Sequence, residues 1–291
     1  MIISASRRTD IPAFYFPWFI NRLKAGACMV RNPFNPKQEY EVSLKTEDVD
    51  AIVLWSKNPA PCMHMLDEVE KRGFRYLFLF TLNDYPASLE PHVPPVSARV
   101  RVFRDLADRI GSERVIWRYD PVIISNLTGY DYHEKAFAEI ARKLEGSTSR
   151  VITSVVDFYR KTERRLKKLE PGLLCDRNAS GSGRMKDLMK SFSSIAADAG
   201  IQLQTCAEEE DCGVKAGACI DGELIRDLWG IDIDTSRDRG QRAHCLCTRS
   251  KDIGAVDTCL HGCTYCYSTR SHEAAITNGR RHDPSGPFLL T

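Results

Sequence analysis

The sequence lacks the features that mark a membrane or secreted protein. It has no apolar run long enough to span a bilayer, and its N-terminus, Met1–Ser4, has no basic region followed by an apolar stretch. We therefore expect a cytoplasmic protein with no membrane partner.

The sequence also lacks an excess of charge of either sign. The 291 residues carry a formal net charge of +2, with 43% hydrophobic and 27% charged residues, which is ordinary for a globular protein and argues neither for nor against a polyanionic partner. The sequence contains no glycine-rich phosphate loop, no nucleophile elbow and no paired-histidine zinc motif. Hydrolase functions that use these motifs are therefore disfavoured.

Cysteine, by contrast, is abundant and unevenly distributed. Of the eleven cysteines, eight lie between Cys206 and Cys266. Without a secretory signal, such thiols are more often metal ligands or free thiols than a disulfide framework. The three earlier ones, Cys28, Cys62 and Cys175, are expected to be small buried hydrophobic residues.

Short apolar runs alternate with helical patterns, which predicts an α/β fold with a parallel sheet covered by helices. We expect a partial (β/α)6 TIM-like barrel over residues 1–205, closed by a cysteine-rich segment, 206–291, that metal binding orders. A basic run over 160–168 is interpreted as a solvated helix face, and 176–184 as a loop. The expected strands are 1–6, 50–55, 75–81, 114–118, 150–156 and 201–205, and the expected helices are 14–25, 61–72, 95–110 and 130–144.

Polar residues follow the carboxyl ends of the expected strands, where parallel α/β folds place their active sites. Helix capping and turn formation are the alternative role for the Asn and Asp residues among them. Arg118 is suited to pair with a carboxylate in bidentate fashion. The candidates for cofactor or substrate contact are Asp10, Lys57, Asn83, Arg118 and Asp120.

The most specific signal is a cysteine motif, Cys259-x3-Cys263-x2-Cys266, with Gly262 for a tight turn and Tyr265 before the third cysteine. Three thiolates at this spacing suit three irons of a four-iron cluster and leave the fourth iron without a protein ligand. A missing ligand makes room for a substrate or cofactor, as at catalytic metals generally. Zinc is the alternative, although it usually takes four ligands, often in C-x2-C pairs, and only Cys263 and Cys266 fit that spacing.

Four further cysteines, drawn from separated segments, form a second candidate metal set: Cys206, Cys219, Cys245 and Cys247. They would close a structural metal site or a second cluster, with Cys212 as a spare ligand. Iron–sulfur is favoured over zinc here because the neighbouring motif is itself typical of a cluster. His244 and His261 lie beside these cysteines but are not expected to coordinate metal.

The segment Cys259–Tyr267 resembles the cluster motif of radical S-adenosylmethionine (SAM) enzymes and is most similar to the branch that contains spore photoproduct lyase. The residues after two strands, Lys57–Pro59 and Arg118–Pro121, also look like motifs of that branch. The resemblance implies a 4Fe-4S cluster whose open iron binds SAM, with Tyr265 beside the adenine. Reductive cleavage of SAM would then give a 5′-deoxyadenosyl radical, with an electron donor such as flavodoxin or ferredoxin. The glycine-rich methionine-binding motif of such barrels is not evident.

The motif departs from radical SAM enzymes in its position, because it usually follows the first barrel strand and here lies near the end of the chain. The whole chain, from Ser4–Asp10 to His282–Pro284, resembles an uncharacterised bacterial family that keeps the motif at its C-terminus. We interpret this as a circular permutation in which Ser4–Asp10 is the usual second strand. The three sulfurs should then converge on the carboxyl end of the sheet.

These observations favour a radical SAM-like enzyme, whether lyase, transferase or oxidoreductase, that acts on an unknown substrate. One alternative is an iron–sulfur protein that carries electrons or senses iron or oxygen without SAM. Another is a radical lyase-like enzyme that acts on nucleic acid, for which a basic helix over 160–168 is the supporting feature.

Overall fold

The computed structural model describes residues 1–35, 37–169, 172–208 and 213–290. Its main feature is a seven-stranded parallel sheet with the strand order β8-β7-β6-β5-β4-β1-β9. The strands are β1 (Ile2–Ala5), β4 (Ala51–Ser56), β5 (Tyr76–Thr81), β6 (Val115–Val122), β7 (Arg150–Val155), β8 (Gln202–Thr205) and β9 (Ser250–Asp252).

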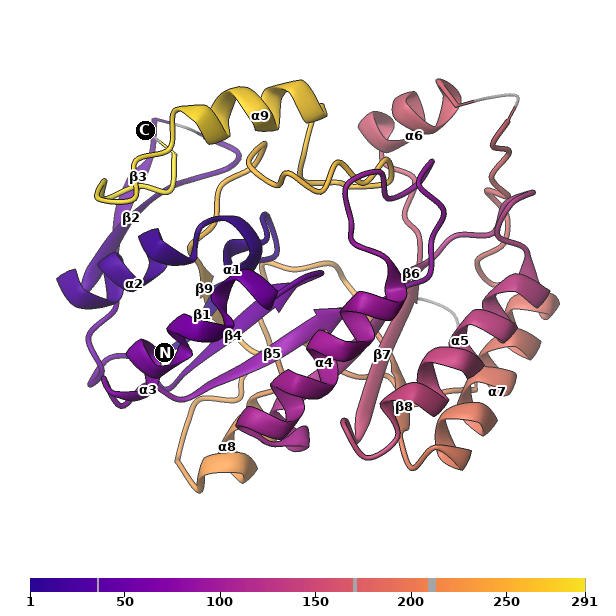
Figure 1. The fold of residues 1–291 in the computed structure, drawn as a ribbon, viewed down its shortest axis with the longest axis horizontal. Helices are drawn as coiled ribbons and strands as arrows, with labels where there is room; N and C mark the ends of the chain where they lie inside the picture. Colours follow the sequence, from indigo (N-terminus) through magenta and orange to yellow (C-terminus); the bar gives the residue numbers. More distant parts are fainter. Residues whose placement is uncertain (36, 170–171, 209–212, 291) are drawn as a thin grey trace.

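A separate antiparallel hairpin consists of β2 (Ala27–Arg31) and β3 (Glu39–Ser43). In Figure 1, α3, α4 and α5 lie in front of the sheet, and α6 and α9 lie above it. The helices are α1 (Ile11–Phe14), α2 (Phe16–Ala25), α3 (Leu66–Glu70), α4 (Val96–Ile110), α5 (Tyr130–Leu144), α6 (Arg160–Lys167), α7 (Gly183–Asp198), α8 (Gly222–Trp229) and α9 (His272–Arg280), with 3-10 turns η1 (Ala60–Met65) and η2 (Ser112–Arg114).

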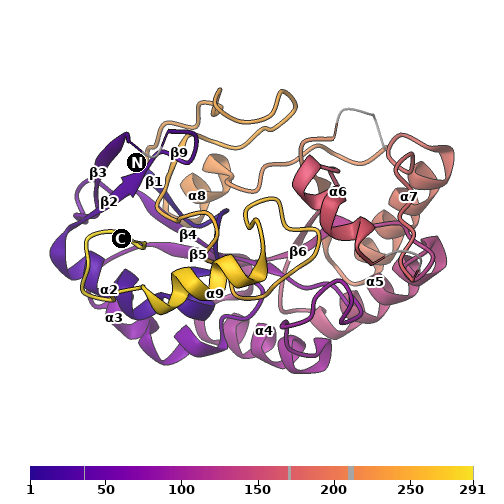
Figure 2. The ribbon, with the colours of Figure 1, turned by 90° about the horizontal axis from the view of Figure 1, so that it is seen from above.

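The two faces of the sheet are covered by different parts of the chain, as Figure 2 shows. Because side chains alternate along a strand, Leu54 and Phe78 lie in one core with the helices. Val53 and Leu79 point to the other face and pack in a second core with residues that follow β8. The chain after β8 therefore forms the cover of one whole face.

The expected parallel α/β sheet with covering helices is confirmed, but the expected closed barrel is not. Over the residues that the structure describes, β8 and β9 are the two edges of the sheet, so the sheet is open. The C-terminal segment adds β9 beside β1 instead of joining the two edges. The sequence Ser250–Asp252 is polar and short, so no apolar run announces this strand.

The boundaries of individual elements show which sequence signals were reliable. The helix expected over 130–144 matches α5, and the helix expected to stop at Gly26 does so, with that glycine in a left-handed conformation. Tyr15 interrupts the helix expected over 14–25, and the helix expected over 61–72 is a 3-10 turn followed by a short α-helix. The hairpin, α7, α8, α9 and β9 are additional to the predicted elements. In the described part of the chain, no helix is both long and apolar enough to cross a membrane.

One buried histidine links the end of β6 to α5. The Nδ1 atom of His133 accepts a hydrogen bond from the Tyr119 hydroxyl (2.8 Å), and Nε2–H donates to the Ile123 carbonyl (2.9 Å). This arrangement requires the neutral ring. Burial lowers the pKa of His133 to about 4, because the charged form would lose its hydration.

We predict that this histidine makes the protein less stable in mild acid. The unfolded chain binds a proton below about pH 6.5, whereas the folded chain does so only near pH 4, so stability falls as the pH falls through that window. The contribution is on the order of 1.4 kcal/mol per pH unit. Denaturant unfolding of the wild type and of His133→Gln should show a stability difference that changes between pH 6.5 and 4. The exposed His64→Gln variant is the control, and an equal pH dependence in all three proteins would contradict the assignment.

Candidate metal centre

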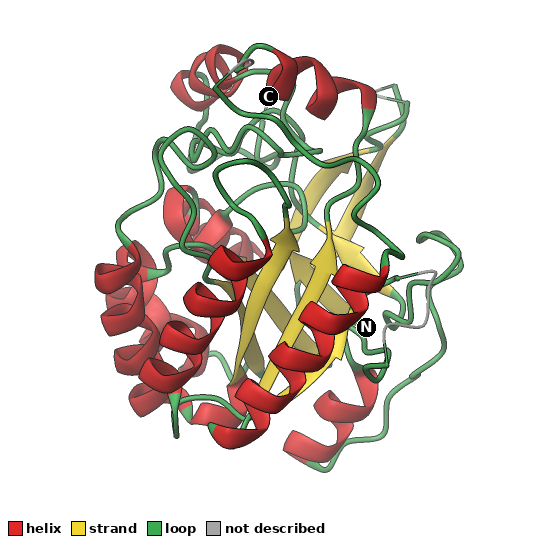
Figure 3. Ribbon diagram, turned by 90° about the vertical axis from the view of Figure 1, so that its right-hand side faces the viewer, coloured by secondary structure: helices red, strands yellow, loops and turns green. Residues whose placement is uncertain are grey.

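The cysteine loop lies beyond the carboxyl end of the sheet. β9 runs parallel to β1, with Ile2 opposite Ser250 and Ser4 opposite Asp252. The chain leaves β9 in the direction of the other strands and passes through Cys259–Cys266 before α9 begins. Figure 3 shows loops and short helices gathered above the arrowheads of the strands.

Hydrogen bonds fasten this loop to the loops that follow β1 and β5. The Tyr267 hydroxyl donates to the Arg7 carbonyl (2.8 Å), and the backbone N–H of Thr264 donates to the Leu89 carbonyl (3.0 Å). The loop therefore lies beside the segments that follow β1 and β5.

All three cysteines of the motif line one cavity of about 520 Å³. Each is half-buried, and burial raises the pKa of Cys259 to about 12, with the nearby Cys266 adding to the rise. Burial likewise raises the pKa of Cys263, which also lies near Cys259 and Cys266. Over residues 1–35, 37–169, 172–208 and 213–290, no group of three or more His, Cys, Asp or Glu side chains is arranged to hold a metal ion. The three thiols therefore share one cavity, but their sulfur atoms are not arranged around a common point.

Gly262 is required by the turn between the first two cysteines. Its φ is +67°, and a Cβ atom there would lie 2.9 Å from a ring carbon of His92 and 3.0 Å from a ring nitrogen of His272. These two rings stack with their centroids 4.3 Å apart. Glycine thus lets the loop pass close to the histidine pair.

Tyr265 belongs to a buried charge cluster centred on Glu90. The Tyr265 hydroxyl donates to Glu90, Lys57 lies 2.7 Å from the same carboxylate, and Arg99 lies 3.8 Å from it. Burial alone would raise the pKa of Glu90, but the two cations outweigh burial and hold that pKa below its ordinary value. The Lys57 ammonium also lies 5.6 Å from the centre of the Tyr265 ring. The loop after β4 and the cysteine loop are therefore joined through one carboxylate.

Asp10 joins three segments instead of leaving a carboxylate exposed to a ligand. It is 5% exposed and accepts hydrogen bonds from the backbone N–H groups of Ala13 (2.9 Å) and Lys57 (2.7 Å). Its third partner is the Nε2 atom of His261 at 2.8 Å. His261 is thus a loop anchor, as the sequence interpretation favours, and Asp10 also caps α1.

Asn83 follows β5, but Arg118 and Asp120 lie within β6, which continues to Val122 instead of ending at the expected residue 118. Asn83 is fully buried, and its side chain donates to the Asp120 carbonyl and accepts from the Asp120 N–H, both at 2.9 Å. Arg118 pairs with the Asp120 carboxylate and lies 4.8 Å from the centre of the Trp55 ring. Asn83 therefore connects the end of β5 to β6. Arg118 is a cation on the face of the sheet that carries Trp55.

Helix α6 is more than a solvated face, because one of its arginines holds the cysteine loop. Arg165 donates to four backbone carbonyls in that loop, those of Thr264 (2.9 Å), Arg270 (3.2 Å), Thr269 and Cys266. Other basic residues of the helix line the same cavity as the cysteines: Lys161, Arg164 and Lys168.

The second set of thiols also comes together in space. Four cysteines are buried in the second core, which α8 also covers, on the face of the sheet opposite α3, α4 and α5: Cys206, Cys219, Cys245 and Cys247. The sulfurs of Cys206 and Cys219 are 3.3 Å apart. Cys212 lies outside the described residues, and His244 is exposed.

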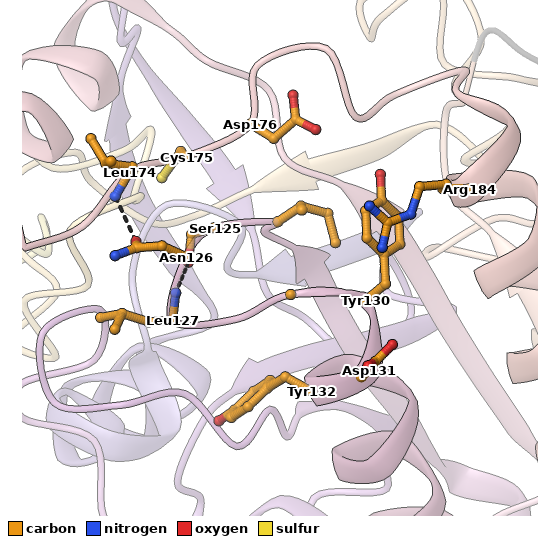
Figure 4. Close-up of a pocket in the computed structure, with 12 residues that line it drawn as sticks. Ser125, Asn126, Leu127, Tyr130, Asp131, Tyr132, Leu174, Cys175, Asp176 and Arg184 are labelled. Atoms are coloured by element: carbon orange, nitrogen blue, oxygen red, sulfur yellow. Dashed lines mark hydrogen bonds between the residues drawn. The ribbon is translucent and has the colours of Figure 1, made fainter.

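The three early cysteines are placed largely as expected. Cys28 and Cys62 are buried in the main core, and burial raises both thiol pKa values, that of Cys28 to about 12. Cys175 is half-buried and lines a different cavity, of about 630 Å³. Figure 4 shows this cavity, where Arg184 lies over the ring of Tyr130. None of the predicted site residues lines it.

The family comparison covers nearly the whole chain. Residues 2–268 match the model of a family described as Domain of unknown function (DUF1848). This chain belongs to the DUF1848 family. The match includes the complete cysteine motif and ends two residues after Cys266. No protein of curated function and no solved structure matches the chain.

In this DUF1848 chain, sequence patterns missed two residues that organise the site. Glu90 lies in a long loop without periodicity, so nothing in the sequence distinguishes it from a surface acid. Arg165 lies within the basic run, next to the exposed Arg164. The one sequence signal that could distinguish the two is the helical spacing of Arg165 from Thr162 and Leu166, which are buried.

We predict that Asp10→Ala destabilises the fold by about 3 kcal/mol or more, because three buried donors would lose a charged acceptor. Asp10→Asn, which keeps one acceptor oxygen, should lose less. Chemical denaturation of both variants measures the difference, and the exposed Asp198→Ala variant, expected to change stability by less than about 0.5 kcal/mol, is the control. Unchanged stability in Asp10→Ala would show that the carboxylate does not join these segments.

Proposed function

We propose that this protein is an iron–sulfur enzyme of the radical SAM type, with a 4Fe-4S cluster held by Cys259, Cys263 and Cys266. One observation carries the proposal. The three cysteines line a single cavity beyond the carboxyl end of a parallel sheet, where this fold class places catalytic groups.

The strand order supports a permuted, partly open barrel. β9 lies beside β1, on the side opposite β4, and the cysteine loop follows β9 directly. In the proposed architecture β9 takes the place of the usual first strand, and β1 that of the second. A loop in that position needs no unusual connection, because both ends of the chain reach the same edge of the sheet.

The residues present fit a cluster by the type and number of their donors. Three thiols, with spacing suited to three irons, border a cavity that is open to a further ligand. When bound, a cluster with one open iron would supply the electron for reductive cleavage of SAM. The protein's own part is to hold the loop, to place charge near the cavity and to exclude water.

Of the candidates from the strand ends, Lys57 is the cation assigned to an anionic group of a cofactor. Burial raises the pKa of Cys263 and the nearby Lys57 partly offsets that rise, while Glu90 holds Lys57 beside Tyr265. An ammonium group in this position suits a carboxylate near the cysteines. The resemblance assigns Tyr265 to the adenine; its hydroxyl is fixed by Glu90 and its ring is buried beside the cysteine cavity, so a cofactor would have to displace part of its cover.

The rim of the cavity favours an acidic partner for electron delivery. Lys161, Arg164 and Lys168 line it from α6, and Arg270 lines it from the loop before α9. Such a cationic rim would steer an acidic electron donor, such as a flavodoxin or ferredoxin, toward the cluster. A nucleic-acid substrate is the second candidate that these cations favour. Its binding would weaken steeply with salt, whereas a near-zero salt slope of DNA binding would count against it.

We predict that anaerobic reconstitution with iron and sulfide yields a brown protein that cleaves SAM to 5′-deoxyadenosine when reduced. Cys263→Ala should lose most of the reconstituted iron and all of this activity, because one thiolate of the cluster is missing. Cys28→Ala, which removes a buried core thiol, is the matched control. Iron, absorption spectrum and 5′-deoxyadenosine are the measurements.

The outcomes separate the candidate functions. If a redox-active cluster forms but yields no 5′-deoxyadenosine, the protein is an electron carrier or sensor and not a radical SAM enzyme. If the motif binds no iron, both functions are ruled out.

We also predict that Arg165→Met weakens iron retention roughly tenfold, because the loop would lose the side chain that holds four of its carbonyls. Arg164→Met removes the same charge from the same helix without releasing the loop, and should retain iron like the wild type. Iron release to a chelator, followed by absorbance, measures both. Equal loss in the two variants would attribute the effect to charge alone.

A further inference from the structure

The four buried cysteines on the second face of the sheet are independent of the proposed cluster site. They lie on the segment that covers this face, drawn in orange in Figure 2. Cys206 follows β8, Cys219 precedes α8, and Cys245 and Cys247 precede β9. Three stretches of chain, far apart in sequence, therefore contribute thiols to one place.

The sulfurs contact one another in a continuous chain. Cys219 interacts with both Cys206 and Cys247, and Cys247 interacts with Cys245 as well. Exposure is between 2% and 6% for all four. The backbone N–H of Ile220 also points at the Cys247 sulfur, at 3.4 Å. Backbone N–H bonds to sulfur are typical of thiolate ligands, whose charge such donors stabilise.

Two arginines lie near these cysteines, and each has one buried N–H donor without a hydrogen-bond partner. Arg7 and Arg118 lie 5.5 and 4.8 Å from the centre of the Trp55 ring. Arg7 interacts electrostatically with Cys247 and Cys219, and Arg118 with Cys219 and Cys206. Asp252 and Asp120 are their carboxylate neighbours. Even so, Nη2 of Arg7 and Nε of Arg118 are buried without a hydrogen-bond partner. Unsatisfied buried cationic donors are costly, so they point to an anion at this position.

We propose that Cys206, Cys219, Cys245 and Cys247 bind a single zinc ion as a closed tetrathiolate site. Four thiolates around Zn²⁺ carry a net charge of −2, and Arg7 and Arg118, each beside a carboxylate of its own, face that charge with their unpaired donors. Sulfurs bound to one zinc at about 2.3 Å lie about 3.8 Å apart in a tetrahedron. The sulfurs of Cys206 and Cys219, now 3.3 Å apart, would have to move apart by about 0.5 Å to bind the ion.

The short distance also decides between zinc and a second cluster. In a four-iron cluster each thiolate binds a different iron, so the body of the cluster must fit between the sulfurs. Thiols in mutual contact leave no such space, whereas a single ion needs only a small outward shift. Zinc is therefore favoured over the second iron–sulfur cluster that the sequence alone favours.

The site would hold the cover of the second face together. In the segment itself Ile220 and Ile225 are fully buried, and further apolar side chains pack against the same core while partly exposed: Leu224, Leu228, Trp229, Ile231 and Ile233. Cys247 lies three residues before β9, and its neighbour Thr248 accepts a hydrogen bond from Gly222 at the start of α8. A closed metal site would thus fix the approach of the chain to β9 and contribute directly to folding.

The decisive experiment uses the full-length protein without the proposed cluster. The variant Cys259→Ala/Cys263→Ala/Cys266→Ala, produced with zinc in the medium, should contain one zinc per chain and almost no iron by elemental analysis. Reloaded with Co²⁺ alone, it should show the sulfur-to-cobalt charge-transfer and intense visible bands of a tetrahedral thiolate site. These readouts do not depend on SAM cleavage, so failure here and failure of the proposed function are distinguishable.

A second variant tests the ligand set. Cys219→Ala in the same background should lose at least tenfold in zinc retention against a chelator, whereas Cys62→Ala should keep it. If the Cys219→Ala protein is insoluble, the zinc and iron content of the triple variant still tests whether the site binds zinc. Iron and sulfide without zinc in that variant, or a Cys206–Cys219 disulfide without metal by mass spectrometry, would overturn the proposal.

Discussion

The pairing of β9 with β1 depends on one partly buried carboxylate, that of Asp252. It accepts hydrogen bonds from the hydroxyls of Ser4 (2.9 Å) and Ser6 (2.7 Å) and from the backbone N–H groups of Arg7 (2.8 Å) and Gly254 (3.0 Å). Gly254 must be glycine, because a Cβ there would lie 2.0 Å from the Ser6 hydroxyl. A three-residue strand is thereby fixed at the edge of the sheet. This attachment directs the chain toward the carboxyl end of the sheet, where the cysteine loop follows.

Beyond that edge, the charged residues are arranged in pairs that set geometry more than they add stability. Glu90 holds Lys57 and Arg99, and Asp10 is saturated by its three donors. Buried ion pairs lose much of their attraction to desolvation, so their main effect is to specify one arrangement of the loops. The thiols at the cavity are not part of this framework of ion pairs. This division between framework and ligands is what the proposed catalytic role requires.

The two faces of the sheet are stabilised in different ways. On one face, large apolar side chains such as Trp117, Phe137 and Phe192 stack between strands and helices. On the other, the covering segment packs mostly partly buried apolar side chains, gathers four thiols and faces two arginines. A metal ion on the second face would add to the apolar burial of this segment. The proposed cluster and the proposed zinc site then have separate tasks, one in chemistry and one in holding β9 in place.

The sequence by itself determined the parallel α/β class, six strands of the main sheet and the cysteine motif, because apolar periodicity and ligand spacing are local properties of the chain. It also placed Lys57 after the end of β4, but it put Arg118 at the end of a strand that in fact continues to Val122. Only the tertiary structure decided that Asp10 and Asn83 serve the framework, that Glu90 and Arg165 hold the cysteine loop, and that the sheet stays open. Each of these depends on partners distant in sequence, such as Asp10 and His261, whose residue numbers differ by 251. Local patterns carry no information about such contacts, because the geometry that makes them exists only after the chain has folded.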